Sequence, residues 1–349
     1  MVTTNNKFGK IVLLIGGLFL LSLMFMEGCS KNSSAEKKGN TSTKKKEITK
    51  EELTEKLKKI DELMKQLKDE NPSVHQTAIE TLKKMLDEKE IKIGERNPEA
   101  MAYLVRGNIN IDLGRYDSRK YAEAISDFDK TIKLEPKCAE AYNGRGYARL
   151  ASIPEENWGN PFHVLGFDEL AQRDKVYSDF NKAIELDPKY ALAYHNRGYA
   201  HIKFGGYPGG FHGAIPDFTK AIELNPKSPI SYASRGYAYK KLGEHMKAIS
   251  DFTKAIELDP EKKYVISHYY FRGEAYDSVG QHTNAISDFT KVIEFNPEYA
   301  EAYYARGKIY ERLGKSRQAL DDFRKFVKLQ PDSKKARELG SKYGDKVWR

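Results

Sequence analysis

The chain repeats one short pattern six times, and the length of the repeat restricts the folds that it can adopt. Each copy contains an Arg-Gly step, then an Asp-Phe step and then a proline. In the last three copies the glycine and the proline are 24 residues apart, and the run from a proline to the next glycine is usually 10 residues, which gives a period of 34. One helical hairpin of this length cannot bury its own apolar face, so the period predicts a stack of hairpins.

The positions that match between copies carry a family resemblance. In the block 229–262 they are Tyr232, Gly236, Ala248, Phe252, Ala255 and Pro260, which stand at positions 4, 8, 20, 24, 27 and 32 of the block. This pattern resembles the tetratricopeptide repeat (TPR) family, and the blocks that begin at Ile266 and Ala300 match nearly as well. The resemblance implies an all-α solenoid of helical hairpins that winds into a right-handed superhelix, with six repeats within residues 99–333.

An arginine at position 7 and an aspartate at position 23 occur in every copy. The pairs are Arg106 and Asp127, Arg145 and Asp179, Arg197 and Asp217, Arg235 and Asp251, Arg272 and Asp288, and Arg306 and Asp322. Six arginines could form a ladder that binds anions, but function rarely needs six equivalent copies in a solenoid. We therefore expect each pair to tie together the two helices of its own hairpin, and to contribute about 1 kcal/mol if it is partly exposed.

The end of the first helix in a hairpin is also marked. Lys241, Leu242 and Gly243 follow the last apolar residue of the helical pattern in the fourth copy. Glycine adopts the left-handed conformation that closes a helix more easily than other residues do. The sequence therefore predicts that the helix stops here, with Gly243 at the left-handed position.

The amino terminus has the features of a secretory signal. Two lysines precede an apolar stretch over residues 11–26, and Gly28-Cys29 follows it. Gly28-Cys29 resembles the end of a bacterial lipoprotein signal, which implies removal of residues 1–28 and lipidation of Cys29. The alternative is an uncleaved membrane anchor, although the stretch is shorter than the ~20 residues that a spanning helix needs. In both cases we expect the repeats to be tethered to a membrane in the bacterial cell envelope, facing the periplasm or the exterior.

The segment after the signal predicts a basic, flexible tether. Residues 29–50 are rich in Lys, Ser, Asn, Thr and Glu, a composition that cannot form a core. Residues 1–50 hold nine Lys and three Glu, so they supply +6 of the net charge of +9. The basic charge therefore lies outside the predicted repeats, where it can meet anionic lipid headgroups, and it does not support binding of nucleic acid.

Helical segments are predicted on both sides of the repeats. In residues 51–98 apolar residues recur at helical spacing before and after Asn71-Pro72, which predicts an N-terminal helical hairpin that acts as a cap or a degenerate repeat. A short coiled coil is disfavoured because the apolar run is shorter than three heptads. Residues 334–349 predict a closing helix that covers the last apolar face of the stack.

The sequence shows no recognisable catalytic or metal-binding pattern. Its eight histidines have no paired metal-ligand spacing, and we find no phosphate-binding loop or nucleophile motif. Cys138 has no cysteine partner if Cys29 is lipidated, and we expect it to lie at the start of a helix. We therefore predict a protein that is not an enzyme and that uses no cofactor and no metal.

The first three copies carry insertions of 5, 18 and 4 residues between the two helices of a hairpin. The longest, near residues 152–175, contains Trp158, Phe162 and Phe167. These aromatic residues could pack on neighbouring helices or contact a partner, and the sequence favours neither reading over the other. A catalytic site in this insertion is disfavoured because it brings no acid–base constellation beyond two glutamates and a histidine.

The resemblance also implies where a partner binds. In TPR proteins, positions 2, 5, 9, 12 and 13 of each first helix face a concave groove that holds extended peptides. The candidate groove residues here are Asn108, Asn143, Tyr147, His195, Tyr199, Tyr237, Lys240, Tyr270, Glu274, Lys308 and Arg312. Three of them, Tyr147, Tyr199 and Tyr237, share position 9 and predict an aromatic track. The family's Lys/Asn clamp for a carboxylate tail is not repeated at positions 5 and 9, so that ligand is not predicted.

These features predict a membrane-anchored scaffold that binds a protein or peptide partner in the concave groove. The alternative is an envelope lipoprotein that binds a glycan or another polymer with the same tyrosines. The position-4 tyrosines provide an internal comparison, because the resemblance places them between the helices; they include Tyr142, Tyr194 and Tyr232. If the position-9 tyrosines are as buried as these, the aromatic track belongs to the core.

Overall fold

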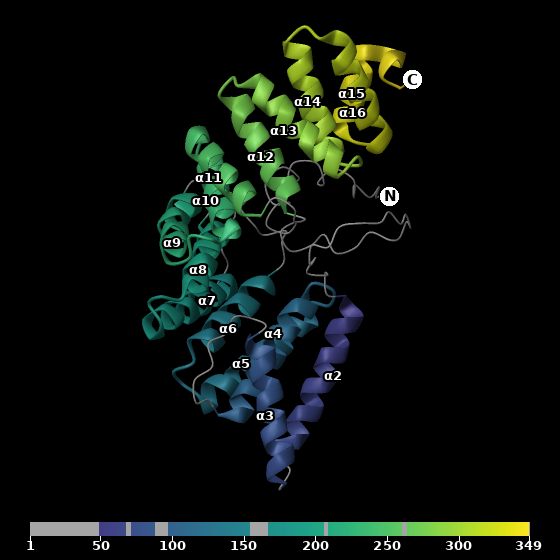
Figure 1. The fold of residues 1–349 in the computed structure, drawn as a ribbon. Helices are drawn as coiled ribbons and strands as arrows, with labels where there is room; N and C mark the ends of the chain where they lie inside the picture. Colours follow the sequence, from purple (N-terminus) through teal and green to yellow (C-terminus); the bar gives the residue numbers. More distant parts are fainter. Residues whose placement is uncertain are drawn as a thin grey trace, which may run out of the picture. The chain divides into compact units, whose positions relative to one another are not determined.

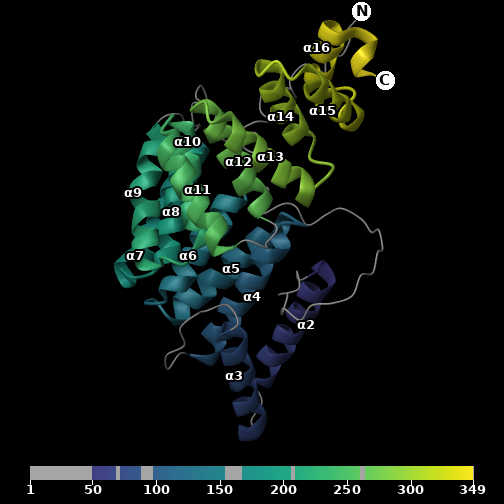
Figure 2. The same cartoon turned by 45° about the horizontal axis from the view of Figure 1, so that its top comes forward.

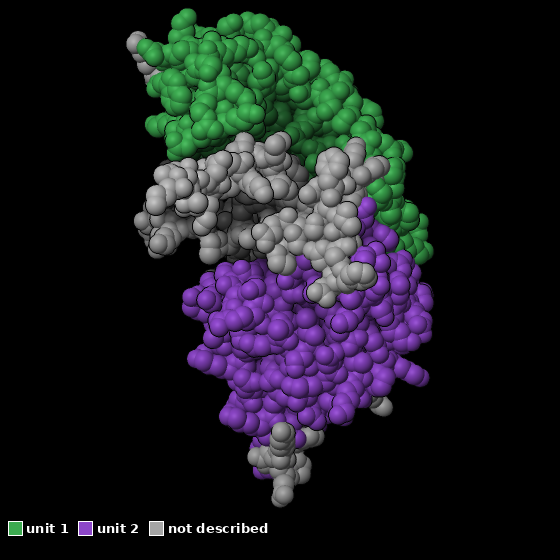
Figure 3. All heavy atoms as spheres, turned by 180° about the vertical axis from the view of Figure 1, so that it is seen from behind, with its two compact units in different colours: residues 1–24, 207–349 green, residues 25–206 purple. Residues whose placement is uncertain are grey.

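The structure, a computed structural model, describes residues 49–67, 71–87, 97–153, 167–205, 209–259 and 264–348. These ranges contain fifteen α-helices, one 3-10 helix and no β-strand (Figure 1). None of the helices in them is long and apolar enough to cross a membrane. The described residues belong to two compact units, which we call the N-terminal unit (residues 49–205, purple in Figure 3) and the C-terminal unit (residues 209–348, green).

The N-terminal unit contains a capping hairpin and the first hairpins of the repeat series. Its helices are α2 (Lys50–Gln66), α3 (Pro72–Asp87), α4 (Pro98–Gly114), α5 (Arg119–Leu134), α6 (Ala139–Ala151), α7 (Phe167–Leu186) and α8 (Ala191–Phe204). Helix α2 begins with a capping box, in which Thr49 and Glu52 each accept a hydrogen bond from the other's backbone N–H. Both α2 and α3 pack on α4, so the predicted N-terminal hairpin covers the first repeat.

The C-terminal unit contains the remaining hairpins and the closing helix. Its helices are α9 (Phe211–Leu224), α10 (Pro229–Lys241), α11 (His245–Leu258), α12 (Val265–Ser278), α13 (His282–Phe295), α14 (Ala300–Arg312), α15 (Ser316–Leu329), α16 (Lys334–Tyr343) and a 3-10 helix, Gly344–Val347. Figures 1 and 2 both show α12 beside α13 and α14 beside α15, and each first helix packs on its second helix and on the next hairpin. The predicted all-α solenoid of helical hairpins is confirmed.

The phenylalanine of each Asp-Phe step forms the centre of the packing. All six are buried, with at most 1 % of their surface exposed: Phe128, Phe180, Phe218, Phe252, Phe289 and Phe323. A Cβ atom on Gly107 would lie 2.8 Å from the ring of Phe128, and one on Gly307 would lie 2.7 Å from the ring of Phe323. Only glycine leaves room for the ring, which explains why the Arg-Gly and Asp-Phe steps recur together.

The predicted helix stop is also confirmed. Gly243 has a φ of 79° directly after α10, and Gly280 and Gly314 have the same left-handed conformation after α12 and α14. This conformation turns the chain into the second helix of these three hairpins.

The longest insertion differs from the prediction at its carboxyl end. Helix α7 begins at Phe167, so residues 167–175 are helical, whereas the sequence assigned them to the insertion. This segment opens with an acidic pair and continues with leucine and alanine, which favour the first turn and the interior of a helix. Trp158 and Phe162 lie outside the described residues, as does the side chain of Phe167, so their predicted partner contacts stay a prediction.

The closing helix covers the end of the stack as predicted. Ala336 and Leu339 of α16 and Val347 of the 3-10 helix are buried in one cluster with Phe323 and Phe326 of α15. Ser333 caps α16 with its side-chain oxygen, which accepts a hydrogen bond from the Ala336 N–H at 3.1 Å. In the N-terminal unit, Cys138 is the buried residue before α6, as expected from its position.

Candidate functional site

The recurring arginines and aspartates form bidentate ion pairs inside the hairpins. In five repeats both residues lie in one unit, and in each of these the arginine Nε and Nη2 donate to the aspartate carboxylate. The distances from Arg272 to Asp288 are 2.8 Å for both bonds. The aspartates are buried, with 2–6 % of their surface exposed. The pairs therefore hold the two helices of a hairpin together, which confirms the structural reading.

Each arginine also reaches the preceding hairpin, which sequence reasoning missed. All six donate from Nη1 to a side-chain oxygen on an earlier helix, which is the second helix of the preceding hairpin in five cases and α2 in the first repeat. The acceptors are Asp61, Asp129, Asn181, Thr219, Thr253 and Thr290. Five of them stand at position 25, and Asp61 of α2 takes this place for the first repeat. The sequence could have indicated this bond, because position 25 carries a residue with a side-chain oxygen in each of the first five repeats. The pattern is hard to see because that residue is Asp, Asn or Thr.

Tyrosines cover the faces of these arginines. The position-4 tyrosine lies 5.3–5.9 Å from the guanidinium carbon in all six repeats. In the last three repeats the guanidinium carbon also lies 5.7–6.0 Å from the ring of a second tyrosine, at position 11: Tyr239, Tyr276 and Tyr310. Because their nitrogens donate to neighbouring helices and tyrosine rings lie beside their guanidinium groups, the arginines hold the hairpins together. They are not arranged as a ladder that binds anions.

In the N-terminal unit, most candidate groove residues are held inside the protein. Asn143 is buried and accepts a hydrogen bond from Asn196 at 2.9 Å, which joins α6 to α8. His195 is also buried, and burial lowers its pKa to about 4. Tyr199 is 7 % exposed, and Asn108 donates back to the Leu104 carbonyl of its own helix. Tyr147 is half-buried and is the candidate in this unit with the most aromatic surface to offer.

In the C-terminal unit, the aromatic candidates pack among other rings. Tyr237 is 5 % exposed and lies edge-on to Phe271, with the ring centroids 5.7 Å apart. Tyr270 packs on Phe289 at 5.6 Å. The position-4 tyrosine Tyr232 is half-buried, so Tyr237 is at least as deeply buried as the residue chosen for comparison. These observations assign Tyr199 and Tyr237 a packing role.

The charged candidates form a ladder of ion pairs along the first helices of the C-terminal unit. Lys240 of α10 pairs with Glu274 of α12, and Asp277 of α12 pairs with Arg312 of α14. The next rung joins Glu311 of α14 to Lys342 of α16 at 2.9 Å and to the Tyr343 hydroxyl. Lys308 also contacts Glu311, at 2.7 Å. We call this set the charge ladder.

Three charged members of the charge ladder were not among the predicted residues. Asp277 and Glu311 stand at position 12, which the resemblance already assigned to the groove, and Lys342 lies 34 residues after Lys308. The repeat spacing could therefore have found all three. Burial opposes ionisation of Glu311, but the hydrogen bonds from Lys308, Tyr343 and Lys342 outweigh it and lower its pKa to about 2. This carboxylate is charged at any physiological pH.

Among the described residues, no group of three or more His, Cys, Asp or Glu side chains is arranged to hold a metal ion. The ladder offers paired charges of both signs and no proton-transfer group with a buried, reactive environment. What it can do chemically is exchange its internal ion pairs for pairs with another molecule.

Comparison with solved structures shows the same fold. PilF of Pseudomonas aeruginosa aligns with 70 % of this chain and 97 % of its own, at 14 % identity and a TM-score of 0.53. The C-terminal part of a TPR protein from Cytophaga hutchinsonii aligns with 81 % of this chain and 98 % of its own, at 20 % identity and a TM-score of 0.50. The Cut9-Hcn1 assembly aligns with 83 % of this chain and 52 % of its own, at 16 % identity and a TM-score of 0.51. At such identities the likeness concerns the fold alone.

Family models give the sequence-level result. Models described as tetratricopeptide repeat match residues 114–152, 180–209, 229–262 and 300–333, and one described as TPR repeat matches 273–314. No curated protein sequence matches the chain. The segments 229–262 and 300–333 each contain one Arg-Gly step, one Asp-Phe step and one helical hairpin of the structure. The chain belongs to the tetratricopeptide repeat family.

Proposed function

We propose that this TPR protein is a scaffold that binds a protein partner at a membrane of the bacterial cell envelope. Stacked TPR hairpins provide extended surfaces for protein–protein interaction, which is the general use of this architecture. The observation that carries the proposal is the charge ladder, in which separate ion pairs join α10 to α12, α12 to α14 and α14 to α16. The side chains of Lys308 and Arg312 are 43 % and 49 % exposed, so a partner can reach them.

The chemistry of the row indicates the kind of partner. It presents both basic and acidic side chains, so it fits a polar segment that carries both charges. Exposed pairs of this type set specificity and association rate more than affinity. The glycan alternative depends on open tyrosine faces at position 9, and the burial of Tyr199 and Tyr237 gives it no support.

Removing the exposed charges of the ladder should weaken partner binding without unfolding the protein. We expect the double variant Lys308→Ala, Arg312→Ala to bind a partner captured from intact envelopes at least tenfold more weakly, because it loses two exposed contacts of about 1 kcal/mol each. Its free energy of unfolding should change by less than about 1 kcal/mol. The measurement is a binding titration with the captured partner, together with urea unfolding.

A matched control uses two lysines on second helices. Lys254 and Lys291 are both 48 % exposed and pair with glutamates three residues later, so Lys254→Ala, Lys291→Ala removes the same charge at the same exposure. This variant should bind like the wild type. Equal binding by both double variants would show that the ladder is not the partner site.

We propose further that the chain is held at the membrane by a lipid on Cys29. The support comes from the short apolar stretch before Gly28-Cys29 and from the basic tether, all of which lie outside the described residues. Each buried methylene of an acyl chain contributes about 0.8 kcal/mol, so two or more chains would anchor the protein stably.

The anchor proposal predicts a processing defect. Cys29→Ala should leave a longer, precursor-sized protein, whereas Cys138→Ala should be processed normally because Cys138 is buried in the repeats. Mass spectrometry of the amino terminus, together with membrane fractionation, checks the result. An intact and unmodified amino terminus on the wild-type protein would favour an uncleaved helical anchor instead.

A further inference from the structure

Position 11 is filled differently in the first repeat than in the others. In the last three repeats it holds a tyrosine that covers the arginine, and in the second repeat it holds Arg149, which pairs with Asp179. The third repeat has His201, whose ring contacts the Tyr177 hydroxyl at 3.2 Å. The first repeat has Asn110, which is too short to cover Arg106. The space that a larger side chain would fill is open there.

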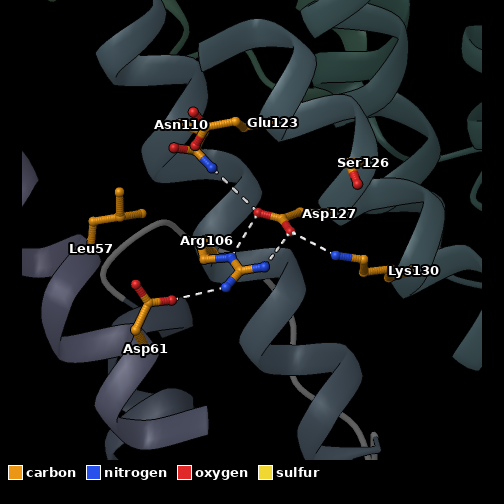
Figure 4. A pocket seen from close by; sticks show the side chains of 8 residues that line it. All are labelled: Leu57, Asp61, Arg106, Asn110, Glu123, Ser126, Asp127 and Lys130. Atoms are coloured by element: carbon orange, nitrogen blue, oxygen red, sulfur yellow. Dashed lines mark hydrogen bonds and ion pairs between the residues drawn. The ribbon is translucent and has the colours of Figure 1, made fainter. Parts of the chain in front are cut away.

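This space is a pocket of about 300 Å³ between α2, α4 and α5 in the N-terminal unit. Figure 4 shows Arg106 and Asp127 in its middle, Asn110 and Glu123 at one end, and Asp61 of α2 across from them. Lys130 lies beside Asp127. The pocket uses positions 7 and 11 of α4, whereas the proposed partner surface uses positions 9, 12 and 13 of other helices, so the two sites are independent.

The nitrogen donors in the pocket are already engaged. The Nε and Nη2 atoms of Arg106 donate to Asp127 at 2.9 and 2.7 Å, and Nη1 donates to Asp61 at 2.8 Å. The amide nitrogen of Asn110 donates to Asp127 at 3.3 Å. Lys130 lies 4.0 Å from Asp127 and 5.0 Å from the centre of the Tyr103 ring. An anionic ligand would find no arginine nitrogen free to receive it.

One acceptor in the pocket is unsatisfied. Asn110 is 1 % exposed, and its side-chain oxygen has no hydrogen-bond partner among the described residues. Buried polar atoms are nearly always bonded, so a lone acceptor beside a cavity points to a donor that binds there. The carboxylates of Asp61, Glu123 and Asp127 stand beside the cations of Arg106 and Lys130. Glu123 also accepts from Lys120 at 2.7 and 2.8 Å, so a cation in the pocket would take the place of Lys120 in this partly exposed pair. These carboxylates are not grouped to hold a metal ion.

We propose that this pocket binds a single organic cation, an ammonium or guanidinium group, which donates to the Asn110 oxygen and pairs with Glu123. The group has the N–H donors that the lone acceptor lacks, and its positive charge can replace that of Lys120 at Glu123. Its size suits a cavity at the small end of ligand sites. Because Asp61 belongs to α2, an occupant would also tie the capping hairpin to the first repeat.

The test is a titration of the full-length protein with methylguanidinium chloride and with propylammonium chloride at constant ionic strength. We expect saturable one-to-one binding, observed by calorimetry and by a shift of the Asn110 side-chain amide signals in NMR. Sodium acetate, an anion of similar size, should not bind. Binding of acetate as tight as that of the cations, or the absence of saturable cation binding, would overturn the proposal.

Two variants of Asn110 distinguish the contribution of its acceptor oxygen from that of the open space beside it. Asn110→Leu removes the acceptor and should weaken cation binding at least tenfold, the loss expected for one hydrogen bond to a charged group. Asn110→Tyr introduces the residue that the last three repeats carry at position 11, so it should fold, cover Arg106 and abolish binding. Unchanged binding in Asn110→Leu would overturn the assignment even if the tyrosine variant failed to fold.

A last experiment distinguishes two sources of the cation, a side chain of another protein and a small molecule. A short capped peptide with one central arginine is compared with methylguanidinium. Tighter binding by the peptide identifies a side chain of another protein as the natural occupant, and tighter binding by the free cation identifies a small molecule. Either result supports binding in the pocket only if Asn110→Leu weakens the binding of that ligand.

Discussion

Arg235→Ala is expected to lower the free energy of unfolding of the C-terminal unit by about 3 to 5 kcal/mol. Asp251 is 5 % exposed, and without Arg235 it loses two hydrogen bonds of 2.8 and 2.9 Å and remains as an uncompensated buried charge. The bond from Arg235 to Thr219 of α9, at 3.1 Å, is lost as well. The burial of the carboxylate raises the expected loss above the 1 kcal/mol that suits a partly exposed pair.

The same pair can be tested by removing both charges. Arg235→Met, Asp251→Leu should recover most of the loss, because an apolar pair leaves no unpaired charge in the hairpin. Lys254→Ala, which breaks an exposed pair, should cost less than about 1 kcal/mol. Urea unfolding of the three variants checks these values. A loss for Arg235→Ala no larger than that for Lys254→Ala would mean that the arginine contributes little to the stack.

The sequence was sufficient for the elements that every repeat must share. The 34-residue period, the glycine at position 8 and the phenylalanine at position 24 predict close-packed hairpins, because the ring packs against a helix that lacks a Cβ atom at this point. The pairing of Arg235 with Asp251 followed from the same repetition. Such features are fixed by local geometry that recurs six times, so a single sequence contains several independent examples of each.

The partner surface was harder to predict, because it depends on what lies next to each residue. Position 9 holds a tyrosine in three repeats, yet Tyr237 is buried because Phe271 packs against it. Spacing alone does not say whether a neighbouring repeat covers a side chain. The pocket at Asn110 was missed for a related reason, since it arises from the absence of a large residue at a position where other repeats have one.

The stability of the C-terminal unit should decrease as the pH falls from 7.5 to 5, because of His268 on α12. This histidine is 2 % exposed, and neither ring nitrogen has a hydrogen-bond partner among the described residues. It stands at position 3, where the other five repeats have alanine or serine. Burial lowers its pKa from 6.5 to about 4. Between these values the unfolded chain binds the proton and the folded chain does not, so acid favours unfolding.

The expected loss follows from that pKa difference. One pKa unit corresponds to about 1.4 kcal/mol, so lowering the pH to 5 should cost about 2 kcal/mol, and the full difference about 3 kcal/mol. His268→Leu removes the titrating group and both unsatisfied nitrogens. Between pH 7.5 and 5 the free energy of unfolding of this variant should therefore fall by about 2 kcal/mol less than that of the wild type.

Urea unfolding of the wild type and of His268→Leu at pH 7.5, 6 and 5 measures the effect. Because His195 in the N-terminal unit also has a pKa of about 4, the difference between wild type and variant, and not the total slope, reports on His268. If His268→Leu follows the pH dependence of the wild type, the imidazole is protonated equally in the folded and unfolded chains. The ring of His268 would then contact water or a hydrogen-bonding group, and its burial without hydrogen-bond partners would be wrong.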